Sequence, residues 1–277
     1  MNIGEAIQWG AGQLTDSDSP VLDARVLLSE ALEASLTYLF TWPDKPVSGS
    51  TLTTYQSFIA QRASGQPVAY ITGQREFWSL RLKVSPHTLI PRPDTETLVE
   101  QALARLPQTP SYICDLGTGT GAIALALASE RPNDKLLGVD RIAEAVALAR
   151  DNARLNNIGH ANFMQSSWFD ALAGQQFDMI VTNPPYVESN SNYLSVGDVR
   201  FEPASALTAG SDGLSDIRTI IAQAPAYLNR EGWLLIEHGH TQSEAVQQLL
   251  VQAGFSNVTS EADLAGHLRI TCGQLTG

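Results

Sequence analysis

Residues 112–130 read YICDLGTGTGAIALALASE, and this stretch decides the fold of the chain. The apolar strand pattern YICDL is followed at once by alternating glycines and then by the apolar helix pattern AIALALASE. Glycine adopts positive φ without steric cost and lets the backbone come close to a ligand at a helix N-terminus. We therefore predict a strand, a glycine turn and a helix that together begin an α/β domain.

The sequence after residue 130 repeats this alternation of strand and helix. Apolar strand patterns such as KLLGVD, ANFMQ, FDMIVT and WLLIEHG are separated by amphipathic helix patterns, and a strand pair ending in HLRITCG follows. Uniformly apolar strands are typical of a parallel sheet covered by helices on both faces. We predict a Rossmann-like α/β domain with a mainly parallel seven-stranded sheet, whose binding crevice lies at the carboxyl ends of the strands.

The first seventy residues have the pattern of a small helical domain. Ser19 and Pro20 predict the start of one helix. Its apolar face is expected to consist of Val21, Ala24, Leu28 and Ala31. The alternating patterns REFWSL and RLKV predict a short β-hairpin after this domain. We therefore divide the chain into a helical domain at 1–73, a β-hairpin linker at 74–92 and the α/β domain at 93–277.

Composition and charge narrow the classes of function. The 277 residues carry 17 Lys and Arg against 29 Asp and Glu, a net charge of −12, which disfavours direct binding of nucleic acid. No apolar run is long enough to span a bilayer and the N-terminus lacks a signal-peptide pattern, so we expect a cytoplasmic protein without a membrane partner. Cys114 and Cys272 lie in apolar strand patterns and are expected to be buried thiols. The sequence contains no metal-binding motif.

The glycine turn and an acidic residue after the second strand indicate a cofactor that contains a ribose. Gly117, Gly119 and Gly121 have the spacing of a dinucleotide-binding turn. Asp140 follows at about the distance at which a carboxylate accepts hydrogen bonds from a ribose diol. Asp140 also has a second interpretation, as the N-cap of the next helix. A nicotinamide dinucleotide and S-adenosylmethionine both contain this ribose, so the turn and Asp140 do not choose between them.

The fourth strand pattern ends in Asn183-Pro184-Pro185-Tyr186, and these residues suit a planar nitrogen. The Asn183 side-chain oxygen and the Pro184 carbonyl can each accept one hydrogen of an NH₂ group, while the Tyr186 ring packs against its plane. The prolines restrict the backbone, so both acceptors are in place before the substrate arrives. These acceptors stabilise the positive charge that develops when the nitrogen attacks an in-line methyl group.

Three alternatives stay open at this point. A nicotinamide-dependent dehydrogenase normally needs a titratable group at its hydride site, which the tetrapeptide does not supply. A methyltransferase of adenine or guanine amino groups would use the same tetrapeptide but should carry a basic face. A protein that binds the cofactor without turnover is the third.

Trp168, after the third strand, is either a core residue or stacks on the purine of the cofactor.

Several motifs together resemble one family. DLGTGTGA, Asp140 and NPPY in this order are typical of class I S-adenosylmethionine-dependent methyltransferases. REFWSL, TLIPRPDTE, SNYLSVGDVRFEP and LLIEHG extend the likeness to the bacterial release factor glutamine methyltransferases (PrmC/HemK) over nearly the whole chain. The resemblance implies methylation of the side-chain amide nitrogen of the glutamine in the Gly-Gly-Gln motif of class-1 peptide chain release factors. The implied methyl donor is S-adenosyl-L-methionine and the product S-adenosyl-L-homocysteine.

The resemblance also implies roles by position. Asn183, Pro184 and Tyr186 would be catalytic, and together with Pro185 they would hold the glutamine amide. The cofactor would contact Asn183 and a second set of residues. That set consists of Gly117, Thr118, Gly119, Thr120, Gly121, Asp140 and Trp168.

Three further expectations follow from the same resemblance. Residues 91–93 would border the substrate pocket. The family often has an acidic residue where this chain has Ser167, so the chain lacks a carboxylate at that place beside the adenine. The N-terminal domain is expected to recognise another part of the release factor, and the protein is expected to act as a monomer.

Overall fold

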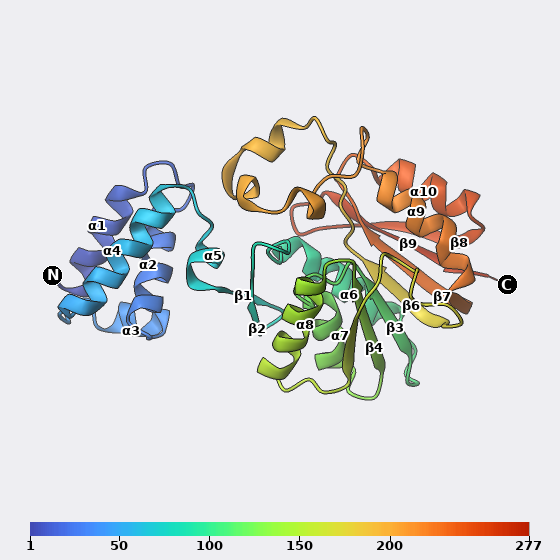
Figure 1. The fold of residues 1–277 in the computed structure, drawn as a ribbon, viewed down its shortest axis with the longest axis horizontal. Helices are drawn as coiled ribbons and strands as arrows, with labels where there is room; N and C mark the ends of the chain where they lie inside the picture. The colour runs from blue at the N-terminus through green and yellow to red at the C-terminus, as the bar shows by residue number, and fades with distance from the viewer. Residues whose placement is uncertain (277) are drawn as a thin grey trace. The chain divides into compact units, whose positions relative to one another are not determined.

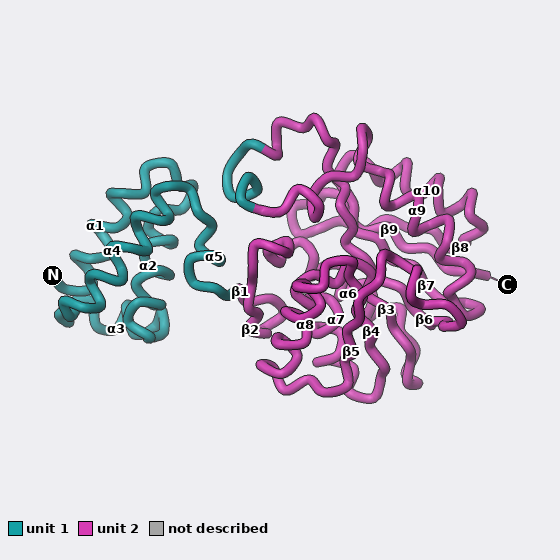
Figure 2. The backbone as a smooth tube through the Cα atoms, in the orientation of Figure 1, with its two compact units in different colours: residues 1–74, 195–201 teal, residues 75–194, 202–277 magenta. Residues whose placement is uncertain are grey.

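The computed structural model describes residues 1–276 and divides the chain into two compact units. Unit 1 consists of residues 1–74 and 195–201, and unit 2 of residues 75–194 and 202–277 (Figure 2). The first unit therefore includes a short segment that follows the NPPY stretch in the sequence by about ten residues. No helix in the described part of the chain is long and apolar enough to cross a membrane.

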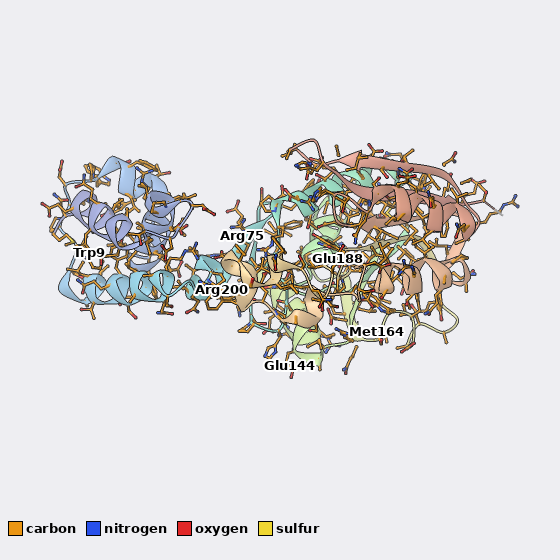
Figure 3. The ribbon with its side chains drawn as sticks, turned by 90° about the horizontal axis from the view of Figure 1, so that it is seen from above. Trp9, Arg75, Glu144, Met164, Glu188 and Arg200 are labelled. Atoms are coloured by element: carbon orange, nitrogen blue, oxygen red, sulfur yellow. The ribbon has the colours of Figure 1, made fainter. Side chains whose placement is uncertain are left out.

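Unit 1 is built from five helices. They are α1 Ile3–Gln13, α2 Pro20–Ala31, α3 Leu36–Thr41, α4 Gly49–Ala63 and α5 Val68–Thr72. A capping box starts α1, because the Asn2 side chain accepts from the Glu5 backbone while the Glu5 side chain accepts from the Asn2 backbone. Trp9 lies among these helices (Figure 3) and packs edge-on against the buried Tyr55 ring, with 6.0 Å between ring centroids.

The predicted apolar face of α2 is partly wrong. Ala24 and Leu28 are buried as expected, but Val21 is 44% exposed. The buried stripe instead runs through Asp23, because its carboxylate accepts hydrogen bonds from Ser17 and Ser19. The Ser19 hydroxyl donates to Asp23, so Ser19 stands at the N-cap position without making a side-chain hydrogen bond to the helix backbone.

Segment 195–201 is held in unit 1 by a partly buried ion network. The Arg62 guanidinium pairs with Asp23 on α2 and with Asp198 in the 3₁₀ helix η3 Gly197–Phe201, each at 2.7 Å. The Arg62 and Asp23 side chains are 13% and 10% exposed, so this pair is weakly screened by solvent, whereas the Asp198 side chain is 40% exposed. After the NPPY stretch the chain therefore contributes residues 195–201 to unit 1, where Asp198 pairs with Arg62, and belongs to unit 2 again from residue 202.

Unit 2 contains the predicted seven-stranded sheet (Figure 1). Its strands are β3 Tyr112–Leu116, β4 Lys135–Asp140, β5 Ala161–Gln165, β6 Phe177–Thr182, β7 Leu228–Glu237, β8 Phe255–Ala262 and β9 Leu268–Leu275. Their order is β5-β4-β3-β6-β7-β9-β8. The pairs from β5 to β7 are parallel, and β9 is antiparallel to both β7 and β8. The predicted fold class is confirmed.

Helices cover both faces of this sheet. They are α6 Glu96–Arg105, α7 Ala122–Glu130, α8 Ala143–Leu155, α9 Ser215–Gln223 and α10 Ser243–Gln252. Alternate strand residues enter two separate cores, Ile113 on one face with α6, α7 and α8, and Cys114 on the other with α9 and α10. Burial on both faces explains why the strands read as continuous apolar runs.

The predicted hairpin is present as β1 Gln74–Phe77 and β2 Leu80–Lys83. Asn152 of α8 connects β2 to the glycine turn, because its side chain bonds the backbone N–H and C=O of Lys83 and also the C=O of Thr120. The short helices η1 Pro93–Thr95, η2 Asn192–Ser195, η4 Ala204–Ala206 and η5 Ala224–Ala226 complete the chain. Both cysteines are buried thiols, as predicted.

Gly138 in β4 tests how closely the glycine turn is packed. A Cβ at this position would lie 2.6 Å from both Phe163 and the Thr118 hydroxyl. We expect Gly138→Ala to lower the free energy of unfolding by about 1–3 kcal/mol through overpacking, measured by urea denaturation. Gly159→Ala is the matched control because a Cβ there meets open space. Equal urea midpoints for the two variants would contradict this account.

Candidate active site

The parallel register brings the ends of three strands to one edge of the sheet. Leu116 of β3 pairs with Thr182 of β6, and Thr182 pairs with Ile236 of β7. The Thr182 hydroxyl also donates to the Leu116 carbonyl at 2.7 Å. The glycine turn, the NPPY stretch and Glu237 therefore leave the sheet side by side.

The glycine turn has the backbone that the sequence predicts. Gly117, Gly119 and Gly121 all have positive φ, of 71°, 53° and 83°. Thr118 is buried, and its backbone N–H bonds the Val139 carbonyl at 2.9 Å. This bond ties the turn to the end of the neighbouring strand β4 and leaves the backbone of Gly117 and Gly119 open to a cavity.

Asp140 holds the turn from the second strand. Its carboxylate accepts from the Gly119 N–H at 3.0 Å and from the Ile142 N–H at 2.9 Å. The alternative role as N-cap of α8 is wrong, because Ile142 occupies the cap position. Burial raises the pKa of Asp140 above its usual value, opposed by these two hydrogen bonds. Each carboxylate oxygen keeps a lone pair for a further donor.

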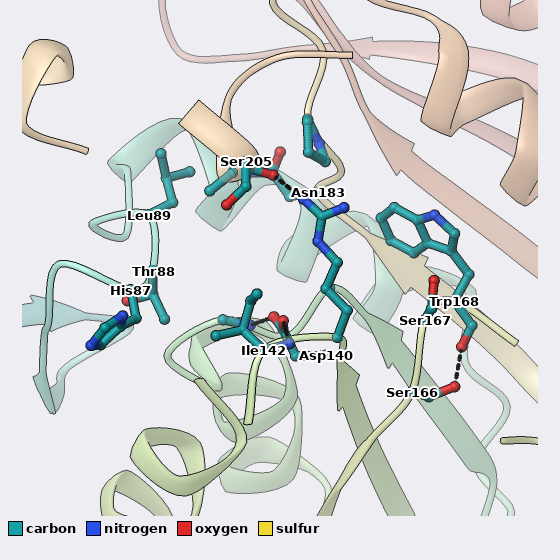
Figure 4. A pocket seen from close by; sticks show the side chains of 15 residues that line it. His87, Thr88, Leu89, Asp140, Ile142, Ser166, Ser167, Trp168, Asn183 and Ser205 are labelled. Carbon is teal, nitrogen blue, oxygen red and sulfur yellow. Dashed lines mark hydrogen bonds between the residues drawn. The ribbon is translucent and has the colours of Figure 1, made fainter. Parts of the chain in front are cut away.

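Trp168 lines this cavity and is only partly buried against the hydrophobic core. Figure 4 shows its indole, Asp140 and Asn183 around the same space. The backbone of Trp168 has φ of 45° and its carbonyl accepts from the Ser166 hydroxyl at 2.9 Å. A Cβ on Gly117 would lie 3.3 Å from the indole ring, so glycine is needed for this close approach. The ring is thus held at the edge of the cavity beside the glycine turn.

Two cavities meet at Asn183. The first, which we call the turn cavity, is lined by His87, Thr88, Leu89, Gly117, Gly119, Asp140, Arg141, Ile142, Ser166, Ser167, Trp168, Asn183, Pro185, Ser205 and Ala206. The second, the amide cavity, has among its lining residues Arg92, Pro93, Asp94, Asn183, Pro184, Tyr186, Glu237, His240 and Arg269. Neither cavity is lined by the other three residues of the glycine turn, which are Thr118, Thr120 and Gly121.

The Asn183 side chain is oriented with its oxygen unpartnered. Its Nδ2 donates to the buried Thr95 hydroxyl at 3.2 Å. Its Oδ1 is buried without a hydrogen-bond partner within the described chain. A buried carbonyl oxygen without a partner is costly, and such atoms commonly mark a place that a ligand donor fills. The tetrapeptide therefore holds an unsatisfied acceptor on a residue that lines both cavities.

Tyr186 closes the amide cavity on one side. Burial raises the pKa of its phenol, and the nearby Glu237 charge raises it further. The Tyr186 carbonyl accepts from Gln242 Nε2 at 3.1 Å, and a Cβ on Gly213 would lie 2.2 Å from the same carbonyl oxygen. The backbone after the prolines is therefore fixed by close contact with the loop before α9.

Two acidic residues at this edge are missed by the sequence interpretation. Asp115 and Glu237 are both 1% exposed, and each has one carboxylate oxygen without a partner. Burial raises the pKa of each to about 7. The available signal was an acidic residue at or next to the end of an apolar strand, in YICDL and WLLIEHG. An acidic residue in such a pattern is also compatible with an ordinary strand end, so the sequence alone does not assign it to the site.

The segment before η1 is anchored by Glu202. Its buried carboxylate accepts from the Ile90 N–H at 2.9 Å and pairs with the Arg92 guanidinium. Arg92 and Pro93 line the amide cavity. The motifs IPRPDTE and RFEP, which are far apart in the sequence, are thus joined beside the NPPY stretch.

Two family models match the chain. One is described as the PrmC N-terminal domain and covers residues 5–73, and the other as the methyltransferase small domain and covers residues 94–212. The second range contains the glycine turn, Asp140 and the NPPY stretch. The fold and this site therefore define a methyltransferase, and the dehydrogenase alternative is wrong.

Curated relatives are similar over nearly the full length. Proteins named release factor glutamine methyltransferase are 54% identical in Vibrio cholerae, 54% in Pseudomonas aeruginosa and 49% in Escherichia coli. Each match covers 95% of this chain, and 92%, 95% and 95% of the relative. The chain belongs to the release factor glutamine methyltransferase family.

Solved structures are similar in fold only. The catalytic domain of hMettl16 in complex with a MAT2A 3′UTR hairpin has a TM-score of 0.60 at 16% identity, covering 79% of this chain and 80% of that one. The Thermus thermophilus 16S rRNA N2 G1207 methyltransferase, in complex with AdoMet and guanosine, has a TM-score of 0.51 at 20% identity. That match covers 73% of this chain and 49% of the other.

Glu202 offers a test of how the amide cavity is supported. We expect Glu202→Ala to lower the free energy of unfolding by about 1–3 kcal/mol, because it leaves the buried Ile90 N–H without an acceptor. Glu202→Gln keeps an acceptor and should lose less, so urea unfolding of both variants separates the hydrogen bond from the charge. Equal losses in the two variants would show that the charge of the Arg92 pair dominates.

Proposed function

We propose that this chain methylates the side-chain amide nitrogen of the glutamine in the Gly-Gly-Gln motif of class-1 peptide chain release factors, with S-adenosyl-L-methionine as the methyl donor. The observation that carries this proposal is Asn183, which lines both cavities and whose buried Oδ1 has no hydrogen-bond partner within the described chain. The names and the full-length similarity of the curated relatives support the same substrate.

The residues of the turn cavity fit S-adenosylmethionine. The open backbone of Gly117 and Gly119 admits close approach, and the Asp140 carboxylate retains acceptor capacity for the ribose hydroxyls. The Trp168 indole supplies a flat apolar surface for the adenine. When bound, the cofactor supplies an electrophilic methyl group on a positively charged sulfur.

The amide cavity orients the nucleophile. Asn183 Oδ1 and the Pro184 carbonyl accept the two N–H bonds of the glutamine amide, and the Tyr186 ring packs on its plane. This arrangement weakens conjugation of the nitrogen lone pair with its own carbonyl and directs the lone pair toward the turn cavity. With S-adenosylmethionine bound, the methyl group would pass from the sulfur to this nitrogen, S-adenosylhomocysteine would remain, and one proton of the nitrogen would be released to solvent.

Mass spectrometry of a release factor tests the proposed reaction directly. Incubation of the factor with this protein and S-adenosylmethionine should add one methyl group to the glutamine of the Gly-Gly-Gln motif. A factor with that glutamine replaced is the control and should gain none. Methylation at any other residue, or none at all with the natural factor, would refute the proposed substrate.

Asn183→Ala separates catalysis from cofactor binding. Loss of one of the two acceptors should lower kcat by about 10²–10³-fold, the usual cost of removing one preorganised hydrogen-bonding group. Affinity for S-adenosylhomocysteine, measured by calorimetry, should change little, because the carboxylate of Asp140 and the glycine turn remain. A variant with nearly full kcat would contradict the role of Asn183, and a protein that only binds cofactor would show no turnover in either form.

The nucleic-acid alternative gains no support from the site. The net charge of −12 opposes binding to a phosphate backbone. The similarity to enzymes solved with RNA or guanosine is at most 20% identical in sequence and concerns the fold alone. Adenine and glutamine both present a planar NH₂ group, so the shared tetrapeptide does not distinguish them.

We also propose that unit 1 recognises a second part of the release factor. Phe40 and Trp42 are 63% and 49% exposed, and the Arg25 and Lys45 cations lie 4.7 Å from the centres of their respective rings. Exposed aromatic side chains with cations beside them are typical of protein contact surfaces.

A double substitution, Phe40→Ala with Trp42→Ala, tests this role of unit 1. It should lower kcat/KM for the intact release factor by about tenfold while cofactor affinity is kept, because hot-spot residues contribute on this scale. Gln56→Ala, at an exposed position of α4, is the control. Unchanged kcat/KM in the double variant would remove this surface from the proposal.

A further inference from the structure

Glu237 is a buried acid that the reaction described above does not use. It ends strand β7, is 1% exposed and lines the amide cavity with Asn183 and Tyr186. The side chains of Thr95 and Asn183 lie beside its carboxylate, and its Oε2 has no hydrogen-bond partner within the described residues. A carboxylate is therefore buried directly behind the residue that holds the substrate nitrogen.

The charges that face Glu237 do not neutralise it. Arg269 of β9 attracts the carboxylate, but its Nε forms ion pairs with Asp263 at 2.9 Å and Asp94 at 3.7 Å instead. Asp94 repels the carboxylate, and the phenol of Tyr186 is the other titratable group beside it. Removing a carboxylate from water without an ion pair is costly. A residue that only filled space here would be more stable without a charge.

The buried Glu237 carboxylate affects the orientation of the Asn183 side-chain amide. An asparagine amide has two orientations of similar shape, which exchange the positions of Oδ1 and Nδ2. In the observed one, Nδ2 faces Thr95 Oγ1 and Glu237, and Oδ1 is left unpartnered. A flipped amide would place its oxygen against an ionised carboxylate, so two acceptors would face each other. Ionised Glu237 therefore disfavours the flipped form.

We propose that Glu237 is a positioning residue that, when ionised and together with Thr95, holds the Asn183 amide with Oδ1 directed toward the substrate nitrogen. This inference rests on the proposed methyl transfer, in which Asn183 Oδ1 is one of the two acceptors. It adds a residue that does not itself need to touch the substrate, and it makes the competence of the site depend on the charge of Glu237.

Protonation of Glu237 should remove this preference. The neutral acid carries an O–H donor, which can bond the oxygen of a flipped Asn183 as well as it accepts from the nitrogen of the unflipped one. Burial raises the pKa of Glu237 from 4.5 to about 7. The orienting effect is therefore present above neutral pH and is lost as the pH falls through about 7.

Steady-state kinetics with matched variants give the first test. For the wild type, kcat/KM for the release factor should rise with pH through the neutral range. Glu237→Gln keeps the shape but can bond either orientation of Asn183, so kcat/KM at pH 8 should fall by about tenfold and lose the rise with pH. Thr95→Ser should retain activity, whereas Thr95→Val should lose it. Combining Glu237→Gln with Thr95→Val should cost less than the product of the two losses, because both act on one amide.

Stability distinguishes this role from a purely structural one. An acid with a raised folded-state pKa binds more protons folded than unfolded between pH 4.5 and about 7, so ionisation destabilises the fold as the pH rises through that window. Glu237→Gln should therefore melt no lower than the wild type at pH 8. A variant that melts as high as the wild type but turns over more slowly shows positioning.

A measurement without release factor separates this inference from the proposed function. In ¹⁵N NMR spectra of the full chain, the Asn183 side-chain NH₂ resonances, assigned by their absence in Asn183→Ala, should titrate in the neutral range. They should stay flat in Glu237→Gln. Titration in the wild type without methylation of a release factor would reject the proposed substrate and keep the positioning role. Resonances that do not respond to pH, or kcat/KM profiles identical in wild type and Glu237→Gln, would overturn the positioning role.

Discussion

The side-chain amide of Asn183 is the constraint on which the rest of the site depends. It lines both the turn cavity and the amide cavity, and its Nδ2 donates to Thr95 while its buried oxygen has no partner within the described chain. The parallel register of β3, β6 and β7 is what brings the glycine turn and the NPPY stretch to this point. A one-residue slip of β6 would reverse every side chain in it and break the junction.

Unfavourable burial is concentrated at this edge of the sheet. The buried oxygens Asp115 Oδ1, Asn183 Oδ1 and Glu237 Oε2 lack partners within the described chain, and the two acids have their pKa raised to about 7. A core selected for stability alone would not keep them, because each unpartnered group costs free energy. These oxygens lie at the carboxyl ends of β3, β6 and β7, which is where ligands bind in open parallel sheets. The free energy of folding is therefore less favourable at the place where a ligand would bind.

Sequence patterns predict well what depends on local chemistry. The glycine turn follows from three residues that need positive φ, and the seven-stranded sheet from the alternation of apolar strands and amphipathic helices. The anchoring of Ile90 and Arg92 by Glu202 could not be predicted, because it joins segments more than a hundred residues apart. The prediction that Val21 lies on the buried face is wrong. Helical periodicity does not show that hydrogen bonds can allow Asp23 to be buried there instead.

The choice of substrate follows from what surrounds the tetrapeptide rather than from the tetrapeptide itself. An enzyme domain solved with an RNA hairpin is similar in fold, so the fold does not show whether the substrate nitrogen belongs to a nucleic acid or to a protein. In this chain the amide cavity is lined by the acidic residues Asp94 and Glu237 and by the basic residues Arg92 and Arg269, and the whole chain carries a net charge of −12. The net negative charge of the chain repels a polynucleotide, whose phosphates accompany every base, but it does not oppose the neutral side-chain amide of a protein loop.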